Sequence, residues 1–407
     1  MARSNIVTGL DIGTHSIKAL VVQQKGKDWE VLSYAEVPST GVRKGAVVSV
    51  EETTKNVQMI MAGIEKDCNR KINSVFVNIG GNHLYVTPSD GIISVSRADQ
   101  IISKEDVDRV LQATKAINIS KNDEVLEVIP KEYIIDDRKG IKKPENLTGV
   151  RLEAKVLLLC CFQSYFTNLT QAVWNSKLQT LEVVPSPLAA ASAVLTQQQK
   201  ELGVALIDIG AATTSLVVFE EGQLIHLAIF PIGSANITND IAIGLKTEVA
   251  VAESIKKQYG SCMFTKLEKD KKDLAKRKIE VIDRSDALSF TKKNLVDIIE
   301  PRVSEILDLV QKELKKINRQ ELLPGGVVLT GGGAKINKIK ELTKETLGLS
   351  CEIGKPRGIV GLEDDPALAT VVGLVLEGVD PDEEGGIIDL TQGLWAKFKK
   401  WLKNFIP

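Results

Sequence analysis

The sequence lacks a hydrophobic run long enough to cross a bilayer, since no apolar stretch among its 407 residues approaches the roughly 18 that a spanning helix needs. Its start, MARSNIVTGLDIG, has neither the apolar core nor the cleavage site of a signal peptide. Lys and Arg number 52 against 53 Asp and Glu, so the basic excess of a general nucleic-acid binder is also missing. We therefore expect a cytosolic globular protein that does not bind nucleic acid.

The five cysteines include no C-x-x-C pair, which argues against the common zinc and redox motifs. Cys160 and Cys161 lie in the apolar stretch KVLLLCCF, which is typical of buried core thiols. This cysteine usage indicates a reducing compartment.

Two common phosphate-binding signatures, G-x-x-x-x-G-K-[ST] and G-x-G-x-x-G, are absent as well. The chain instead has a strand–turn–strand pattern at 5–22, NIVTGLDIGTHSIKALVV, whose turn holds Asp11, Gly13, Thr14 and Ser16. Backbone N–H groups in such a turn can wrap a phosphate. Lys18, just beyond the turn, can reach outer phosphates as a point charge.

A second hairpin, GVALIDIGAATTSLVVFEEGQLI at 203–225, repeats this design with Asp208, Gly210, Thr213 and Thr214. Because the two hairpins lie in different halves of the chain, they predict duplicated halves that face a shared cleft. The Asp at each strand end can hold Mg²⁺ through its water shell, since magnesium takes few carboxylates.

A third glycine loop follows an apolar strand in GGVVLTGGGAKINKIKELTKETLG and precedes an amphipathic helix. Gly331, Gly332 and Gly333 would let backbone approach a flat ligand closely. Taken alone, this loop leaves open an ordinary Gly-rich turn before a helix.

The order D-I-G-T, D-I-G-x-x-T-T and L-T-G-G-G resembles the two phosphate motifs and the adenosine motif of the actin-like ATPase superfamily. The stretches 183–195 and 364–378 resemble its two connecting helices, whose Ala and Gly let them cross closely, and 244–260 resembles its ribose-contacting helix. The resemblance implies an actin-like two-lobed α/β fold that binds ATP and Mg²⁺. The implied contacts are Asp11, Gly13, Thr14, His15, Ser16 and Lys18 in the first loop; Asp208, Gly210, Ala211, Ala212, Thr213 and Thr214 in the second; Gly331, Gly332, Gly333 and Lys335 in the third; and Glu253 and Lys257 on the helix, with Asp11 and Asp208 serving Mg²⁺ through water.

Two features of the sequence bear on whether these residues contact a nucleotide. Ala211 and Ala212 stand where related loops usually have more glycine, so phosphate contact requires negative φ at both residues. Alternatively, Glu253 and Lys257 are an ordinary i,i+4 charge pair on an exposed helix face. His15 is expected to be a solvent-side turn residue, and the lone His83 and His226 to have satisfied hydrogen bonds; no catalytic residue is identified.

Four stretches resemble the FtsA family of bacterial cell-division proteins more than other actin-like branches: IVTGLDIGTHSIKALV, GIKKPENLTGVRLEAKVLLL, ITNDIAIGLKTEVAVAESIKKQYG and LPGGVVLTGGGAKI. The resemblance implies subdomain 1A at 1–83 with 164–195 and 362–379, subdomain 1C at 84–163, subdomain 2A at 196–226 with 306–361, subdomain 2B at 227–305, a linker at 380–392 and a helix at 393–407. Short strands in 84–163 flank a helical stretch opened by Ser103 as N-cap. In this family, 1C takes part in self-association and in contacts with later division proteins.

Within 2B, the Lys-rich segment 266–281 is expected to be a solvated helix face, because acidic residues are interleaved. The family's 2B receives the acidic C-terminal peptide of FtsZ, which makes Lys293 and Arg302 candidate contacts by resemblance. An Arg fork can grip a carboxylate with two bonds. Both residues have the alternative of being surface charges.

The chain ends in GLWAKFKKWLKNFIP, which holds two of its four Trp. On a helix over 393–407, one face is apolar and the other is basic, as in a helix that lies in the headgroup region of an anionic bilayer. The apolar residues are Leu394, Trp395, Phe398, Trp401, Leu402, Phe405 and Ile406, and the basic ones are Lys397, Lys399, Lys400 and Lys403. The Pro-, Gly- and acid-containing stretch 380–392 predicts a linker that detaches this helix from the body.

These features predict a protein that binds ATP, polymerises, and anchors FtsZ filaments to the cytoplasmic face of the plasma membrane at the division site, with at most weak ATPase activity. The alternatives are a PilM-like pilus-assembly platform and an actin-fold small-molecule kinase. A platform protein would lack the amphipathic tail, and a kinase would need a set of polar substrate-binding residues that we do not find.

Overall fold

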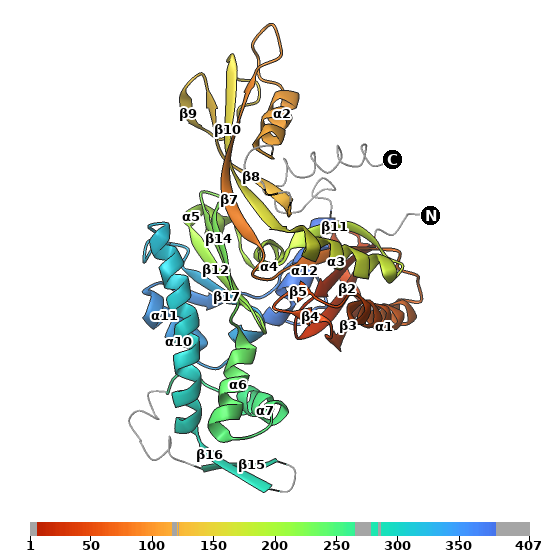
Figure 1. Ribbon diagram of the computed structural model, residues 1–407, viewed down its shortest axis with the longest axis vertical. Coiled ribbons are helices and arrows are strands. Elements are labelled where there is room, and N and C mark those ends of the chain that lie inside the picture. The colour runs from red at the N-terminus through yellow and green to blue at the C-terminus, as the bar shows by residue number, and fades with distance from the viewer. Residues whose placement is uncertain (1–5, 116–119, 121, 265–277, 284–285, 380–407) are drawn as a thin grey trace.

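The computed structural model of the protein describes residues 6–115, 120, 122–264, 278–283 and 286–379. Two mixed five-stranded sheets with the same arrangement of strands form its body (Figure 1). The first sheet has the order β11 (Gln179–Pro185), β6 (Ser74–Ile79), β1 (Ile6–Ile12), β2 (Ser16–Lys25) and β3 (Asp28–Pro38). The second has the order β18 (Cys351–Ile353), β17 (Val327–Thr330), β12 (Val204–Ile209), β13 (Thr214–Glu220) and β14 (Gln223–Phe230).

The two central strands, β1 and β12, have equivalent neighbours. Each pairs antiparallel with the second strand of its hairpin and parallel with a strand from later in its own half. The predicted duplication and both predicted hairpins are therefore confirmed. The hairpin turns, and the loop after β17, lie at the carboxyl ends of β1, β12 and β17, and this places all three glycine loops between the sheets.

Alternation along β2 shows how the first sheet is covered. Ile17, Ala19 and Val21 pack in one cluster with α1 (Val50–Cys68) and α3 (Gln163–Asn175). Leu20 and Val22 pack on the opposite face, in a cluster that also includes residues of the second sheet. Because successive side chains of a strand point to opposite faces, one apolar strand contributes to both layers.

The two predicted connecting helices lie between the sheets. They are α4 (Ser186–Val194) and α12 (Ala369–Gly378), the latter preceded by the 3₁₀ turn η2 (Pro366–Leu368). A Cβ on Gly373 would lie 1.8 Å from the carbonyl oxygen of Ala189, so the backbones are in contact where the helices cross. The prediction that Ala and Gly permit a close crossing is confirmed.

A separate four-stranded sheet rises from one end of the molecule (Figure 1). Its order is β7 (Tyr85–Ser94), β10 (Arg151–Phe162), β8 (Asp123–Ile135) and β9 (Arg138–Ile141), and α2 (Lys104–Lys115) packs on it. The Ser103 hydroxyl accepts a hydrogen bond from the Asp106 backbone N–H at 3.2 Å, as expected of an N-cap.

The opposite end is built from α6 (Ser234–Leu245), α7 (Val249–Tyr259), the hairpin of β15 (Lys278–Asp283) and β16 (Asp286–Thr291), and the long helix α10 (Lys292–Lys316). The expected helix over 266–281 is wrong for residues 278–281, which belong to β15; residues 266–277 lie outside the described residues. Ile279 and Val281 alternate with polar residues and pack against the core, and this strand period outweighed the local charge pattern.

The remaining elements are short: β4 (Val42–Arg43), β5 (Ala46–Val47), α5 (Gln197–Leu202), η1 (Gly332–Lys335) and α11 (Ile339–Leu347). Among the described residues, no helix is both long and apolar enough to cross a membrane. The predicted tail at 393–407, and with it every membrane-contact residue named above, lies outside the described residues.

Candidate functional site

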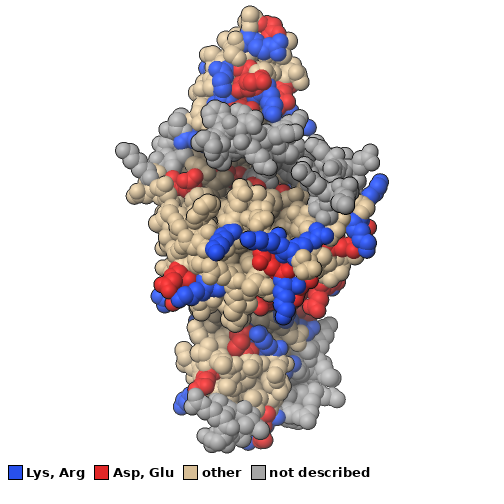
Figure 2. All heavy atoms as spheres, turned by 90° about the vertical axis from the view of Figure 1, so that its right-hand side faces the viewer, with Lys and Arg blue, Asp and Glu red and all other residues tan. Residues whose placement is uncertain are grey.

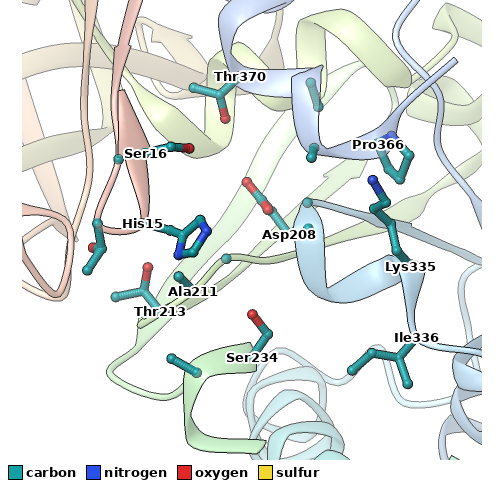
Figure 3. A pocket seen from close by; sticks show the side chains of 18 of the residues that line it. His15, Ser16, Asp208, Ala211, Thr213, Ser234, Lys335, Ile336, Pro366 and Thr370 are labelled. Atoms are coloured by element: carbon teal, nitrogen blue, oxygen red, sulfur yellow. The ribbon is translucent and has the colours of Figure 1, made fainter. Parts of the chain in front are cut away.

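A cleft of about 850 Å³ lies between the two lobes, where the three glycine loops and α7 converge. Figure 3 shows His15 and Ser16 on one side of it, Lys335 on the other, and Asp208 between them. Clefts of this size ordinarily hold a ligand of drug or nucleotide dimensions.

Most of the predicted contacts meet in this cleft. Its lining includes Asp11, Gly13, Thr14, His15, Ser16, Lys18, Asp208, Gly210, Ala211, Thr213, Glu253, Lys257, Gly331, Gly332 and Lys335. The predicted residues outside the lining are Ala212, Thr214 and Gly333. Thr214 is fully buried and donates to the Ile232 carbonyl at 2.8 Å, and a Cβ on Gly333 would lie 2.3 Å from Ile209, so both support the loops from behind.

A buried network holds the first loop. The Asn78 side chain accepts from the Ile12 N–H at 2.6 Å and donates to Asp11 at 2.8 Å and to the Ser186 hydroxyl at 3.0 Å. The Thr14 hydroxyl accepts from the Gly45 N–H at 2.8 Å. Lys18 lies 3.6 Å from the Asp11 carboxylate, at the floor of the cleft.

The second loop is fixed by the start of α6. The N–H groups of Ser234 and Ala235 donate to the carbonyls of Gly210 and Ala211 at 2.9 and 2.8 Å. Ala211 and Ala212 both have negative φ, so their methyl groups impose no backbone strain. The structural requirement for phosphate contact at this loop is met.

The third loop depends on one glycine conformation. Gly331 has φ +81, and a Cβ there would lie 2.1 Å from the Asp208 carboxylate. Gly331 therefore lets the third loop lie directly against the second hairpin. Beyond it, the Lys335 ammonium pairs with Asp365 at 2.7 Å, and Asp365 caps η2 by accepting from the Ala367 N–H at 2.9 Å.

Two carboxylates, Asp11 and Asp208, come from equivalent strand ends and face the same cleft. Burial, together with the charge of Asp11, raises the pKa of Asp208 to about 6. Burial also raises the pKa of Asp11, although Lys18 and Asn78 oppose this. The described residues contain no cluster of three or more His, Cys, Asp or Glu suited to a metal.

On α7 the structure separates two neighbouring lysines. Lys257 is 64% exposed and lies 3.5 Å from Glu253, whereas the side chain of Lys256 is only 7% exposed. The Lys256 ammonium contacts Glu253 at 2.6 Å and donates to the Thr238 hydroxyl at 2.7 Å and the Ser234 carbonyl at 3.1 Å. Burial would raise the pKa of Glu253, but the hydrogen bonds from Lys256 and Thr238 outweigh it and lower that pKa.

Sequence patterns had not pointed to Lys256, nor to Asn78, Ser186, Glu36 or Asp365, which also line the cleft. Lys256 lies three residues after Glu253, a spacing that predicts the contact as well as the i,i+4 pair does. The others come from separate segments, so no local motif contains them.

The three histidines differ in environment. His15 is exposed at the cleft, as expected. His226 lies 3.0 Å from the Glu313 carboxylate, so its satisfied state is confirmed. The expectation was wrong for His83, whose buried ring nitrogens have no hydrogen-bond partner among the described residues and whose ring centroid lies 4.5 Å from that of Tyr165; burial lowers its pKa to about 4.

Both candidate peptide contacts lie on α10. Arg302 grips Asp240 of α6 with two bonds of 2.6 and 3.0 Å and also pairs with Glu305. Lys293 is exposed and is the second residue of α10. Nine residues separate the two, which is about half a rotation away on a helix, so the structure does not bring them onto one face.

Known proteins resemble this chain in sequence. A sequence model described as "Cell division protein FtsA" matches residues 205–373, and one described as "SHS2 domain inserted in FTSA" matches residues 81–160. The cell division protein FtsA of Pseudomonas aeruginosa is 35% identical over 98% of this chain and 98% of its own length. The FtsA of Escherichia coli K12 is 31% identical over 98% of this chain and 96% of its own.

Solved structures agree on the fold. A chain of the PilM-PilN type IV pilus biogenesis complex matches with a TM-score of 0.66 at 18% identity, covering 92% of this chain and 99% of its own. MreB5 of Spiroplasma citri bound to ADP matches with a TM-score of 0.56 at 13% identity, covering 98% and 99%. At such identities the likeness shows the actin-like fold and nothing finer.

Proposed function

The chain belongs to the FtsA family of cell division proteins, and on that premise we propose that it binds ATP, self-associates, and anchors FtsZ filaments to the cytoplasmic face of the plasma membrane at the division site. The observation that carries the proposal is identity of 35% over 98% of the chain to one FtsA. The alternative of a pilus-assembly platform is supported only by the likeness to the chain of the PilM-PilN complex. That likeness is at 18% identity and concerns the fold alone.

The cleft is the proposed site of ATP and Mg²⁺. The first two loops offer backbone N–H groups to phosphates, Lys18 adds a positive charge, and Asp11 and Asp208 would hold the hydrated cation. Gly331 and Gly332 would lie against the base, and Glu253 and Lys257 beside the ribose. The fit rests on this chain's own residues: burial first, and then the charge of Asp11, raise the pKa of Asp208, so a cation in the cleft would favour the ionised carboxylates.

The nucleotide would act mainly as a conformational ligand. Its contacts come from both lobes, so binding favours the arrangement in which the lobes are close. The helices α4 and α12 touch at Gly373 and Ala189, and this crossing is the proposed pivot of that movement. We assign no catalytic residue and expect at most weak ATPase activity.

The proposed membrane anchor is residues 393–407, with the linker 380–392. A single amphipathic helix of this length binds reversibly, because ordering the free segment offsets much of the gain from burying its apolar side chains. Self-association would add avidity without a new contact, since linked copies present several anchors to the same bilayer. Polymerisation and membrane attachment are therefore proposed to reinforce each other.

The proposed site for the acidic C-terminal peptide of FtsZ is on α10, where Arg302 is the proposed carboxylate contact. Lys293, on the other side of the helix, would meet a different part of the peptide. Arg302 keeps 28% of its side chain exposed, although Asp240 already holds two of its donors. A peptide carboxylate would therefore compete with Asp240 or Glu305 for the guanidinium. The separate sheet, at 84–163, is the proposed contact for further division proteins and for neighbouring copies.

Recruitment of FtsZ to vesicles tests this proposal. With anionic vesicles, ATP and Mg²⁺, FtsZ should float with the vesicles in the presence of the full chain and stay at the bottom without it. Arg302→Glu should abolish that recruitment while the chain itself still floats, and Lys344→Glu, at an exposed position of α11, should leave it unchanged. FtsZ recruitment that survives Arg302→Glu would remove Arg302 from the site, and failure of the wild-type chain to recruit FtsZ would refute the anchoring function.

A further inference from the structure

At one end of the first sheet, where its parallel strands begin, lie the last described residue, Val379, and several exposed turns. The parallel strands β1, β6 and β11 all begin at this edge, and the turn between β2 and β3 lies there as well. α12 also ends there, since a Cβ on Gly378 would touch Phe76 of β6 and Val7 of β1. We call this the exit edge, because the described chain leaves the body there at Val379.

A large aromatic side chain stands in solvent at the exit edge. Trp174, in the last turn of α3, is 71% exposed, the second highest value among the large apolar side chains described. Its carbonyl accepts from the N–H of Lys177, which closes the helix with φ +63 just before β11 begins. Leu181, the extra residue of a bulge in the edge strand β11, is 48% exposed.

Exposed basic residues outnumber exposed acidic residues along the exit edge. Exposed there are Lys25, Lys27, Lys66, Arg70, Lys71 and Lys177, against exposed Asp28 and Asp67 and the half-buried Glu30, Glu65 and Glu182. Glu30 pairs with Lys25 at 3.1 Å, and Glu65 accepts from the Ile72 backbone N–H at 2.9 Å. Figure 2 shows Lys and Arg side chains across the middle of the face turned toward the viewer, with Asp and Glu side chains beside them. Exposed Trp amid Lys and Arg is the composition of a membrane–water interface.

We propose that the exit edge is a second membrane contact, in which Trp174 and Leu181 enter the headgroup region of an anionic bilayer and Lys71 and Lys177 lie at its phosphates. This rests on the proposed function, because the tail brings the edge to the bilayer. A flexible chain of the length proposed for the linker, residues 380–392, would span about 20 Å on average. The edge of a five-stranded sheet is about 19 Å wide. An anchor on this linker therefore keeps the whole edge within reach of lipid.

The contact would orient the body. A tail on a flexible linker leaves the body free to turn, whereas two contacts set which face meets the bilayer and hence which faces remain for FtsZ and neighbouring copies. The other candidate occupant is the acidic start of the linker, Asp380–Glu384, whose charge also complements this edge. The two occupants make opposite predictions for lipid contact at Trp174.

A single-tryptophan protein tests the proposal. Trp29→Phe, Trp395→Phe and Trp401→Phe in the full chain leave Trp174 as the only reporter. On anionic vesicles whose acyl chains are brominated, emission from Trp174 should shift to shorter wavelength and be quenched. The matched reporter replaces Trp174 with Phe and adds Ile243→Trp, at a site in the second lobe that is 76% exposed, and it should not be quenched.

Each outcome decides between the two proposals. Flotation of the protein without quenching of Trp174 overturns the exit-edge contact and leaves the tail anchor standing, and it is also the result expected if the acidic linker covers the edge. Equal quenching of both reporters indicates non-specific adsorption and overturns the contact as well. Absence of flotation of both the unsubstituted chain and the reporter overturns both proposals. As a second measurement, Lys71→Gln and Lys177→Gln should each weaken partition to anionic vesicles about fivefold, and Lys143→Gln should not.

Discussion

Gly373 of α12 lies against the Ala189 carbonyl of α4 with no space for a side chain, since a Cβ on Gly373 would be 1.8 Å from that oxygen. The contact is backbone against backbone, so no rotamer change relieves it. Both helices lie in the hydrophobic cluster that contains residues of both sheets.

Gly373→Ala should therefore lower the free energy of unfolding by about 3 kcal/mol, because the helices must separate to admit the methyl group. Urea denaturation measures this. Gly63→Ala is the matched control, because Gly63 lies within α1 and a Cβ there meets nothing within 4 Å. That change should stabilise the protein by about 0.5–1 kcal/mol. Equal effects of the two substitutions would refute the close crossing.

Neighbouring glycines of the third loop should respond differently to the same change. Gly331→Ala puts a Cβ 2.1 Å from Asp208 at φ +81, so it should displace Asp208 and reduce binding of a fluorescent ATP analogue at least about tenfold, the equivalent of 1.4 kcal/mol. A Cβ on Gly332 meets nothing within 4 Å, and Gly332→Ala should keep wild-type stability. Unchanged affinity in Gly331→Ala would show that this loop does not contact the nucleotide.

Asp208 should make the nucleotide-free protein less stable as pH rises. Its pKa is raised from 3.8 to about 6, so the folded protein binds the proton more tightly than the unfolded chain does. Stability from this group is fully present below about pH 4 and is lost as pH rises to about 6. Asp208→Asn should therefore match wild type at pH 4 and exceed it at pH 8 by about 3 kcal/mol in urea denaturation.

Asp365 in the same cleft supplies the contrasting control. Burial would raise its pKa, but Lys335 and the Ala367 N–H outweigh this and lower it. Its contribution is therefore present at neutral pH and is lost as pH falls, so Asp365→Asn should be less stable than wild type at pH 8 and approach it in acid. If both variants changed stability in the same direction, the electrostatic account of the cleft would be wrong.

The two lysines of α7 should separate structure from binding. Lys256→Met removes three contacts of a buried ammonium and leaves Glu253 without its nearest cation, so it should cost about 2 kcal/mol of stability. Lys257→Met should change stability by less than about 0.5 kcal/mol, because that side chain is 64% exposed, and should lower nucleotide affinity. Thermal unfolding and binding of the ATP analogue, measured on the same samples, distinguish the two effects. Loss of stability in Lys257→Met and loss of affinity alone in Lys256→Met would contradict these assignments.

Patterns local in sequence predicted much of this site. The hairpins around Asp11 and Asp208 are marked by apolar strands that end in D-I-G, and Gly331 is marked by its triplet. Asn78 and Asp365 could not be predicted in this way, because each reaches the cleft from a segment remote from the residues that it contacts. The choice between Lys256 and Lys257 depends on how α7 is rotated against α6, which tertiary packing decides.

Other features could not be predicted because they depend on the folded conformation or because a competing sequence pattern obscured them. The sequence showed that Ala211 and Ala212 are unusual for such a loop but could not give their φ values. The strand at Lys278–Asp283 was obscured by a run of charges that suited a helix equally well. His83 looked ordinary, and only its surroundings in the folded chain deprive its ring nitrogens of partners.

Flotation with vesicles of an anionic lipid mixture tests the central claim most directly, by comparing the full chain with a chain that ends after Leu390. The full chain should float and the shortened chain should remain in the dense fraction, at equal folded stability and nucleotide affinity. Charge reversal at Lys399 and Lys400 in the full chain should give an intermediate result that added salt weakens further. Equal flotation of the full and shortened chains, or flotation of neither, would contradict the account.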